Sequence, residues 1–186
     1  MNRKALFLDR DGVINIDNRY VHKVSDFQFL DGIFKFCRLA RSKGYLIFVV
    51  TNQAGIGRGY YSVADFNLLT KWMCNKFLAE DVLISKVYFS PYHPEHGVGR
   101  YKKDDYSRKP NPGMIQQAAD EFNLDLSVSV LVGDKITDIQ AGITAGVGQN
   151  ILLMSSSGVR EKITCNIVSS FYDAAGYLWS QKLRNL

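Results

Sequence analysis

An α/β fold with a mostly parallel central sheet is predicted by two features of this sequence. Short apolar segments alternate with longer segments of helical pattern, as in sheets whose parallel strands are joined by helices. Polar clusters follow the first, second and fourth predicted strands. Ligands bind outside the carboxyl ends of the strands in such sheets, so we expect these clusters to meet in one crevice.

The predicted strands are short and apolar. Lys4–Leu8 is an apolar run that ends at a polar turn, which is the pattern of a buried strand. Tyr45–Val50 is rich in residues that favour strands, and it also ends at a polar cluster. Three further strands are expected at Lys86–Phe89, Ser129–Val132 and Gln149–Met154.

The predicted helices have recognisable ends. Gly44 stops the first one, Ser62 is suited to cap the second, and Pro112 suits the first turn of the third. The expected helices are Ile33–Lys43, a long helix from Ser62 to about Ala79, Pro112–Phe122, a helix that follows Gly133-Asp134 and ends near Ala145, and Phe171–Leu183.

The composition is that of a soluble globular protein. Of 186 residues, 46% are hydrophobic and 22% are charged, and we expect a single domain over residues 1–186. No apolar run reaches the length of a membrane span, and the N-terminus lacks the apolar region of a secretory signal, so we expect a cytoplasmic protein. The net charge of +5 suits an anionic substrate but would equally suit nucleic acid. The three cysteines, Cys37, Cys74 and Cys165, form no CxxC pair and indicate neither a disulfide framework nor a local metal site.

Two carboxylates follow the first predicted strand, in the segment Asp9-Arg10-Asp11-Gly12. A carboxylate at a strand end can attack phosphorus and form a covalent acyl phosphate. The second carboxylate can protonate the leaving oxygen and then activate water. Taken alone, the segment could equally be a solvated turn, because Gly12 allows the backbone to turn tightly.

Further polar groups follow the later strands. The Thr51 hydroxyl can bind a phosphate oxygen, and the Lys109 ammonium can offset the charge of a phosphoryl group. Asp134 suits a hard cation such as Mg²⁺. Asp138 could instead serve only the first turn of its helix, where acidic residues are favoured. Each group has an ordinary structural explanation, but their order at successive strand ends indicates a phosphoryl-transfer site.

Together these residues resemble the four signature motifs of the haloacid dehalogenase phosphatases, over nearly the whole chain. The resemblance implies a Rossmann-like three-layer sandwich and a mechanism that passes through an aspartyl phosphate. Asp9 would be the nucleophile and Asp11 the general acid–base, while Thr51 and Lys109 would bind the transferring phosphoryl group. Mg²⁺ would be held by the Asp9 side chain, the Asp11 backbone carbonyl and Asp134.

Three longer segments resemble the D-glycero-D-manno-heptose 1,7-bisphosphate 7-phosphatases: Phe7–Asn15, Thr51–Gly59 and Arg108–Met114. This narrower resemblance implies removal of the 7-phosphate of the heptose bisphosphate, on the route to lipopolysaccharide core or another surface glycan. A guanidinium such as Arg108 can grip a phosphate or sugar hydroxyls with two parallel bonds. The substrate-binding residues implied are Asp17, Asn18, Arg19, Tyr20, Asn52, Gln53, Ala54, Arg108 and Lys135.

The chain departs from this family in the loop Ser90–Asn111. Many relatives hold a structural zinc ion there with Cys, His, Cys and Cys, and the matching residues here are Ser90, Tyr92, Asp105 and Ser107. None is a thiolate or an imidazole, so we do not expect zinc; His93 and His96 lie nearby, but two histidines rarely make a structural site. The loop is too short for a separate domain, which indicates a capless enzyme.

Three other functions remain open on the sequence. Histidinol-phosphate phosphatase would share every catalytic residue, so only a substrate panel separates it. Polynucleotide 3′-phosphatases carry similar segments, but they usually have Leu where Arg10 stands, and the basic residues here form no clear stripe. A non-catalytic binding protein would not need all the reactive groups that are present. We expect a monomer that acts on a small phosphorylated sugar, without nucleic acid or membrane as a partner.

Overall fold

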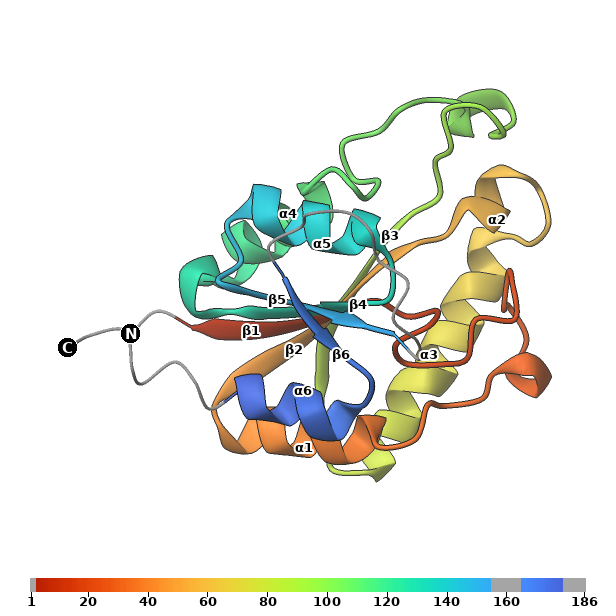
Figure 1. The fold of residues 1–186 in the computed structure, drawn as a ribbon. Coiled ribbons are helices and arrows are strands. Elements are labelled where there is room, and N and C mark those ends of the chain that lie inside the picture. The colour runs from red at the N-terminus through yellow and green to blue at the C-terminus, as the bar shows by residue number, and fades with distance from the viewer. Residues whose placement is uncertain (1–2, 155–164, 179–186) are drawn as a thin grey trace.

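The computed structural model describes residues 3–154 and 165–178, and these form a six-stranded sheet (Figure 1). Its strand order is β3-β2-β1-β4-β5-β6, and every neighbouring pair is parallel. The predicted α/β fold class is therefore confirmed. The strands are β1 (Lys4–Leu8), β2 (Tyr45–Asn52), β3 (Ile84–Ser90), β4 (Val130–Gly133), β5 (Gln149–Leu153) and β6 (Asn166–Val168).

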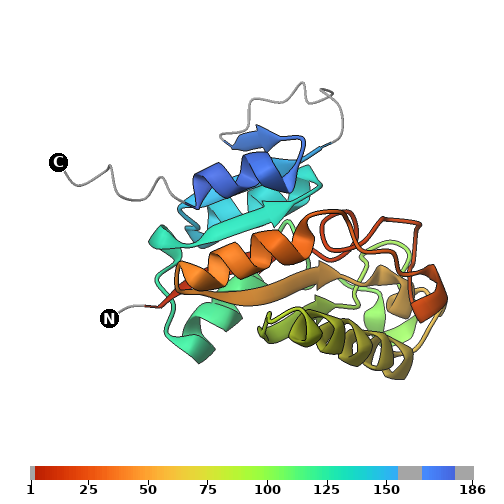
Figure 2. The same ribbon diagram turned by 90° about the horizontal axis from the view of Figure 1, so that it is seen from below.

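Helices cover both faces of the sheet and give three layers (Figure 1 and Figure 2). One face carries α1 (Ile33–Ser42), α3 (Val63–Ala79) and α6 (Phe171–Tyr177). The other face carries α4 (Gly113–Phe122) and α5 (Ile136–Ala145). Short helices complete the described chain: α2 (Ala54–Gly57) and 3-10 turns at Val24–Asp26, Gly99–Tyr101 and Leu126–Val128. Within the described residues, no helix combines the length and the apolar character that a membrane crossing needs.

Strand β1 shows how the sequence divides between the two faces. Leu6 and Leu8 are fully buried in the core shared with α1, α3 and α6, whereas Ala5 and Phe7 are fully buried against α4 and α5. Successive side chains of a strand point to opposite faces. A strand covered by helices on both sides therefore needs a continuous apolar run, which is the pattern that predicted it.

Two predicted helix ends are present in the structure. The Ser62 side chain accepts a hydrogen bond from the backbone N–H of Asp65, and the Asp65 carboxylate accepts one from the backbone N–H of Ser62. This reciprocal pair satisfies amides that the first turn of α3 would otherwise leave unpaired. Gly44 follows α1 with a φ of 81°, a conformation that glycine adopts without strain.

The structure also differs from the prediction. The structure contains strand β6 and helix α2, which the sequence did not predict, because segments of three and four residues are too short to show a periodic pattern. Strand β2 continues through the polar residues Thr51 and Asn52. Helix α6 ends at Tyr177, and residues 179–183 of the predicted C-terminal helix lie outside the described residues. The remaining ends of the observed helices and strands differ from the predicted ends by one or two residues.

Candidate active site

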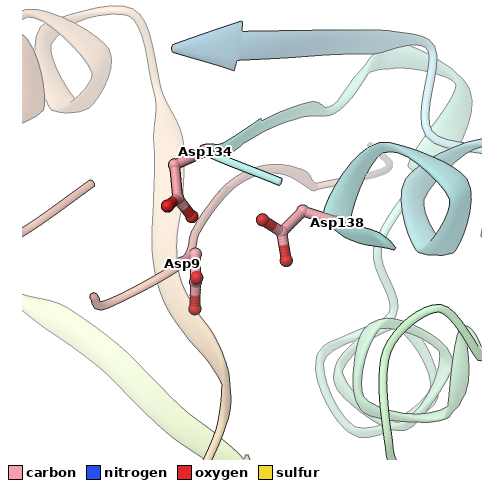
Figure 3. A group of neighbouring side chains, drawn as sticks. All are labelled: Asp9, Asp134 and Asp138. Atoms are coloured by element: carbon pink, nitrogen blue, oxygen red, sulfur yellow. The ribbon is translucent and has the colours of Figure 1, made fainter. Parts of the chain in front are cut away.

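Three carboxylates lie close together where the central strands end (Figure 3). Asp9 follows β1, Asp134 follows β4, and Asp138 lies in the first turn of α5. One oxygen atom from each lies within 4.8 Å of those from the others. Asp9 and Asp138 are buried, so their charges need a cation nearby.

Lys109 supplies such a cation. Its side chain is buried, and its ammonium nitrogen lies 2.9 Å from Asp9 Oδ1 and 2.7 Å from Asp138 Oδ1. It also donates to the backbone carbonyl of Val50 at 2.7 Å. Burial by itself lowers the pKa of Lys109, but Asp138 and Asp9 outweigh burial and the pKa is raised. The lysine therefore stays charged at neutral pH.

Asn52 fixes the backbone of Lys109. Its side-chain amide donates to the Lys109 carbonyl at 3.0 Å and accepts from the Lys109 N–H at 3.1 Å. These two bonds connect the end of β2 to the segment that precedes α4. Asn52, which the family resemblance places in substrate binding, thus also positions Lys109.

Asp134 carries the features of a metal ligand. Burial, and then the charge of Asp9, raise the pKa of Asp134 to about 7. Its Oδ1 atom is buried and has no hydrogen-bond partner among the described residues. A divalent cation would supply the missing partner, because Mg²⁺ prefers oxygen ligands and stabilises the ionised carboxylate. The donor set formed by Asp9 and Asp134 therefore fits Mg²⁺.

Asp138 has two partners of its own. Its Oδ1 pairs with Lys109, and its Oδ2 accepts from the backbone N–H of Lys135 at 3.0 Å, at the start of α5. Burial raises the pKa of Asp138, and Lys109 opposes this rise. The expected helix-start role is thus present, and the contact with Lys109 adds a second role that sequence reasoning missed.

Asp11 is held in place by several donors. The Arg10 guanidinium lies 2.9 Å from its Oδ2, and Gln53 Nε2 and Asn15 Nδ2 each donate to it at 3.0 Å. Arg10 is only 1% exposed and also donates to the backbone carbonyl of Val21 at 2.7 Å. Arg10, which stands where polynucleotide 3′-phosphatases usually have Leu, therefore orients the Asp11 carboxyl group.

Thr51 and Gln53 interact mainly with other protein groups. Gln53 Nε2 donates to Thr51 Oγ1 at 2.9 Å, and Gln53 Oε1 accepts from the Tyr61 hydroxyl at 2.6 Å. Burial raises the pKa of Tyr61 to about 12, so this hydroxyl remains a donor at neutral pH. The chain of bonds runs from Tyr61 through Gln53 to Asp11.

A cavity of about 580 Å³ is lined by Asp9, Asp11, Lys109 and Asp138. Its size suits a sugar phosphate. Except for Asn18, all the residues expected to bind substrate line it: Asp17, Arg19, Tyr20, Asn52, Gln53, Ala54, Arg108 and Lys135. Lys135 also pairs with Asp17 at 3.0 Å and so links α5 to the loop after β1.

The structure adds Gly55, Arg58, Tyr61, His93 and Thr137 to the lining, and sequence reasoning did not single out these residues, although the loop Ser90–Arg108 that contains His93 was expected to shape the pocket. Arg58 lies in the segment Thr51–Gly59 that carried the family resemblance, which was the available signal. No local pattern marks His93 as a cavity residue. Thr51, although expected at the site, is 1% exposed and is not among the described residues that line the cavity.

Hydrogen bonds and ion pairs order the loop in which zinc was considered. The Ser107 hydroxyl lies 3.0 Å from Ser90 Oγ and 2.6 Å from Asp105 Oδ1. Asp105 also pairs with the Lys103 ammonium at 2.7 Å, and that ammonium lies over the Tyr92 ring, 4.2 Å from its centroid. All the positions that match zinc ligands in relatives therefore take part in one polar network.

Gly12→Ala should disable the site. Gly12 has a φ of +93°, and an added Cβ would lie 2.2 Å from Asp134 Oδ2. We expect a loss of stability greater than about 1 kcal/mol, with a loss of phosphatase activity as Asp134 is displaced. Gly146→Ala is the matched control, because Gly146 has a φ of +86° with nothing within 4 Å of its Cβ. Thermal unfolding and activity of both variants check this; equal effects would contradict the clash with Asp134.

Comparison with known proteins identifies the family. A family profile described as HAD-hydrolase-like matches residues 106–163. The D-glycero-alpha-D-manno-heptose-1,7-bisphosphate 7-phosphatase of Burkholderia mallei is 58% identical over 160 residues, covering 86% of this chain and 85% of that protein. The D-glycero-beta-D-manno-heptose-1,7-bisphosphate 7-phosphatase of Vibrio cholerae is 43% identical over 181 residues, covering 96% and 97%.

A solved structure agrees with these relatives. The D,D-heptose 1,7-bisphosphate phosphatase from B. bronchiseptica, complexed with magnesium and phosphate, has a TM-score of 0.78 and 26% identity over 94% of this chain and 97% of that chain. The two relatives match this chain over most of its length, and the solved structure shares its fold. The chain therefore belongs to the D-glycero-D-manno-heptose-1,7-bisphosphate 7-phosphatase family, a group of phosphatases within the haloacid dehalogenase superfamily.

Proposed function

We propose that this chain removes the 7-phosphate of a D-glycero-D-manno-heptose 1,7-bisphosphate through a phosphoryl group carried on Asp9. The observation that carries the proposal is the position of Asp9, which lines the cavity with its Oδ1 2.9 Å from the Lys109 ammonium. Both relatives described above are named for this substrate. A nucleophilic carboxylate beside a fixed cation supports the same reaction class.

In the first step, Asp9 attacks phosphorus and the bond from phosphorus to the C7 oxygen of the sugar breaks. Lys109 engages Asp9 Oδ1, which leaves Oδ2 to form the new bond. The lysine also offsets the negative charge that the phosphoryl group brings. Asp11 gives its proton to the departing C7 oxygen, so the sugar leaves as an alcohol.

In the second step, water attacks the phosphorus of the acyl phosphate, and the bond between Asp9 and phosphorus breaks. Asp11, now ionised, takes a proton from this water, and inorganic phosphate is released. Arg10 and Gln53 contact the Asp11 carboxyl and hold it in position for both proton transfers. Asp9 and Asp11 thus return to their starting states.

Mg²⁺ is the proposed cofactor. Asp9, Asp134 and the backbone carbonyl of Asp11 would hold it, since Asp138 is already engaged by Lys109 and Lys135. The ion supplies charge neutralisation for the transferring phosphoryl group. The unpartnered Asp134 Oδ1 and the magnesium and phosphate of the B. bronchiseptica relative support this assignment.

The affinity for Mg²⁺ should fall about tenfold between pH 8 and pH 6. The pKa of Asp134 is raised to about 7, so below that pH the carboxyl holds a proton that the metal must displace. Titration calorimetry at the two pH values, in two buffers of different ionisation enthalpy, measures both the affinity and the proton release. An affinity independent of pH would contradict the role of Asp134 as a ligand.

The α anomer is the proposed preferred substrate. The relative named for the α anomer is 58% identical to this chain, whereas the one named for the β anomer is 43% identical. Their reactions differ only in the configuration at C1, away from the phosphate that is transferred. Residues at the far end of the cavity would therefore decide the preference.

Phosphate release in the presence of Mg²⁺ tests the proposed function. The panel contains both anomers of the heptose bisphosphate, histidinol phosphate and a 3′-phosphorylated oligonucleotide. We expect the highest kcat/KM with the α anomer. A preference for histidinol phosphate or the oligonucleotide would refute the substrate assignment, although Asp9 chemistry could still operate. A preference for the β anomer would refute only the anomer.

A further inference from the structure

The ring of His93 presents a hydrogen-bond donor to the cavity. Its Nδ1 accepts from the backbone N–H groups of Glu95 at 3.2 Å and His96 at 3.1 Å. A ring nitrogen that accepts carries no proton, so the proton of the neutral ring lies on Nε2. Burial, and then the charges of Arg108 and Arg58, lower the pKa of His93, which favours the neutral form.

Arg58 directs a second donor at the same point. Its Nη2 lies 3.5 Å from His93 Nε2. Both nitrogens are donors, so they do not satisfy each other and both need an acceptor placed between or beside them. Arg58 Nε is also buried and has no partner among the described residues. Both side chains line the cavity that contains Asp9.

The cavity has no carboxylate available for this pair. Its acidic residues already have cations: Asp9 and Asp138 have Lys109, Asp11 has Arg10, and Asp17 has Lys135. Within residues 3–154 and 165–178, neither Arg58 nor Arg108 forms an ion pair with a carboxylate. Arg108 lines the same cavity and adds a further positive charge. This end of the cavity is therefore suited to an anion that arrives with the ligand.

We infer that Arg58 and the Nε2–H of His93 bind the second phosphate of the substrate, the one that is not transferred. The transferred phosphate must contact Asp9 and Lys109; the contacts of Lys109 are with Asp9, Asp138 and the Val50 carbonyl, whereas Arg58 and His93 contact each other. A bisphosphate satisfies the donors at both places, whereas a monophosphate leaves one set unpaired, which costs binding energy. The inference rests on the proposed function, because it requires a substrate with two phosphates.

Two substrates isolate the contribution of the second phosphate. Heptose 1,7-bisphosphate and heptose 7-phosphate differ only in that group, so the ratio of their kcat/KM values measures it. The wild-type protein should prefer the bisphosphate. Arg58→Gln should reduce this preference by about tenfold or more, through a higher KM for the bisphosphate. The kcat/KM for heptose 7-phosphate should fall by a much smaller factor than that for the bisphosphate.

Two substitutions distinguish the acceptor role of His93 Nδ1 from the donor role of its Nε2. Asparagine can place an acceptor near the position of Nδ1 and keep the bonds to Glu95 and His96, but it offers no donor at Nε2. Glutamine can place an N–H near Nε2. Selectivity should therefore be lost in His93→Asn and largely kept in His93→Gln. Arg100→Gln is the matched control for Arg58→Gln, because it removes the same charge at an exposed residue outside the lining.

The outcomes separate this inference from the proposed function. If Arg58→Gln and His93→Asn lower kcat/KM for both substrates by the same factor, the two residues do not bind the second phosphate. If the wild-type protein hydrolyses both compounds equally well, the inference is also wrong and the proposed reaction still stands. If the wild-type protein hydrolyses neither, the proposed function fails, and the inference fails with it.

Discussion

Asparagine at position 9 should lower phosphatase activity by a factor of about 10⁴ or more while the protein stays folded. An amide is a poor nucleophile, so the phosphoryl group has no acceptor. The fold should persist because asparagine matches aspartate in shape, and Lys109 keeps Asp138 as a partner at 2.7 Å. Losing the charge of Asp9 also removes one cause of the raised pKa of Asp134.

Phosphate release measures the loss of activity in Asp9→Asn, and thermal unfolding measures whether the variant stays folded. Asp120→Asn provides the control, since it makes the same chemical change at an exposed residue of α4. The unfolding temperatures of both variants should be close to that of the wild type. Appreciable turnover by a well-folded Asp9→Asn protein would contradict the covalent mechanism.

Methionine at position 109 should lower both activity and stability. Activity should fall about 10³-fold, because the fixed charge that balances the phosphoryl group is lost. The free energy of unfolding should fall by about 3–5 kcal/mol, because the buried carboxylates of Asp9 and Asp138 lose the cation they share. Denaturant unfolding and steady-state kinetics measure the two effects.

A double variant separates the two roles of Lys109. Lys109→Met combined with Asp138→Asn removes both the cation and one of the charges that it balances. Part of the lost stability should return, since fewer unpaired charges remain buried, whereas activity should stay low. Should the single variant be as stable as the wild type, the ion pairs would not support the fold in the way described.

The parts of the structure that follow from local pattern were predictable. Strand β1 is a continuous apolar run, and the position of Asp9 at its end follows from that run alone. Since neighbouring parallel strands end at the same edge, Thr51 and Asp134 could be placed near Asp9 as well. Strand β6 could not be predicted, because its three residues form no pattern.

Contacts between side chains from distant segments could not be read from the sequence. The pairing of Asp138 with Lys109 depends on how the loop before α4 returns to the sheet, and helix propensity explains Asp138 without it. The approach of Arg58 to His93 depends on two loops at once. Gln53 looks like a substrate contact within its motif, yet its amide bonds both Asp11 and Tyr61.

The central claim is that Asp9 carries the phosphoryl group, and trapping that species tests it most directly. Heptose 1,7-bisphosphate is mixed with the Mg²⁺-loaded protein, the reaction is quenched with acid within one turnover, and the peptides are analysed by mass spectrometry. The account predicts one phosphoryl group on the peptide containing Asp9. Turnover without a phosphoryl group on Asp9, or with one on another residue, would contradict the account.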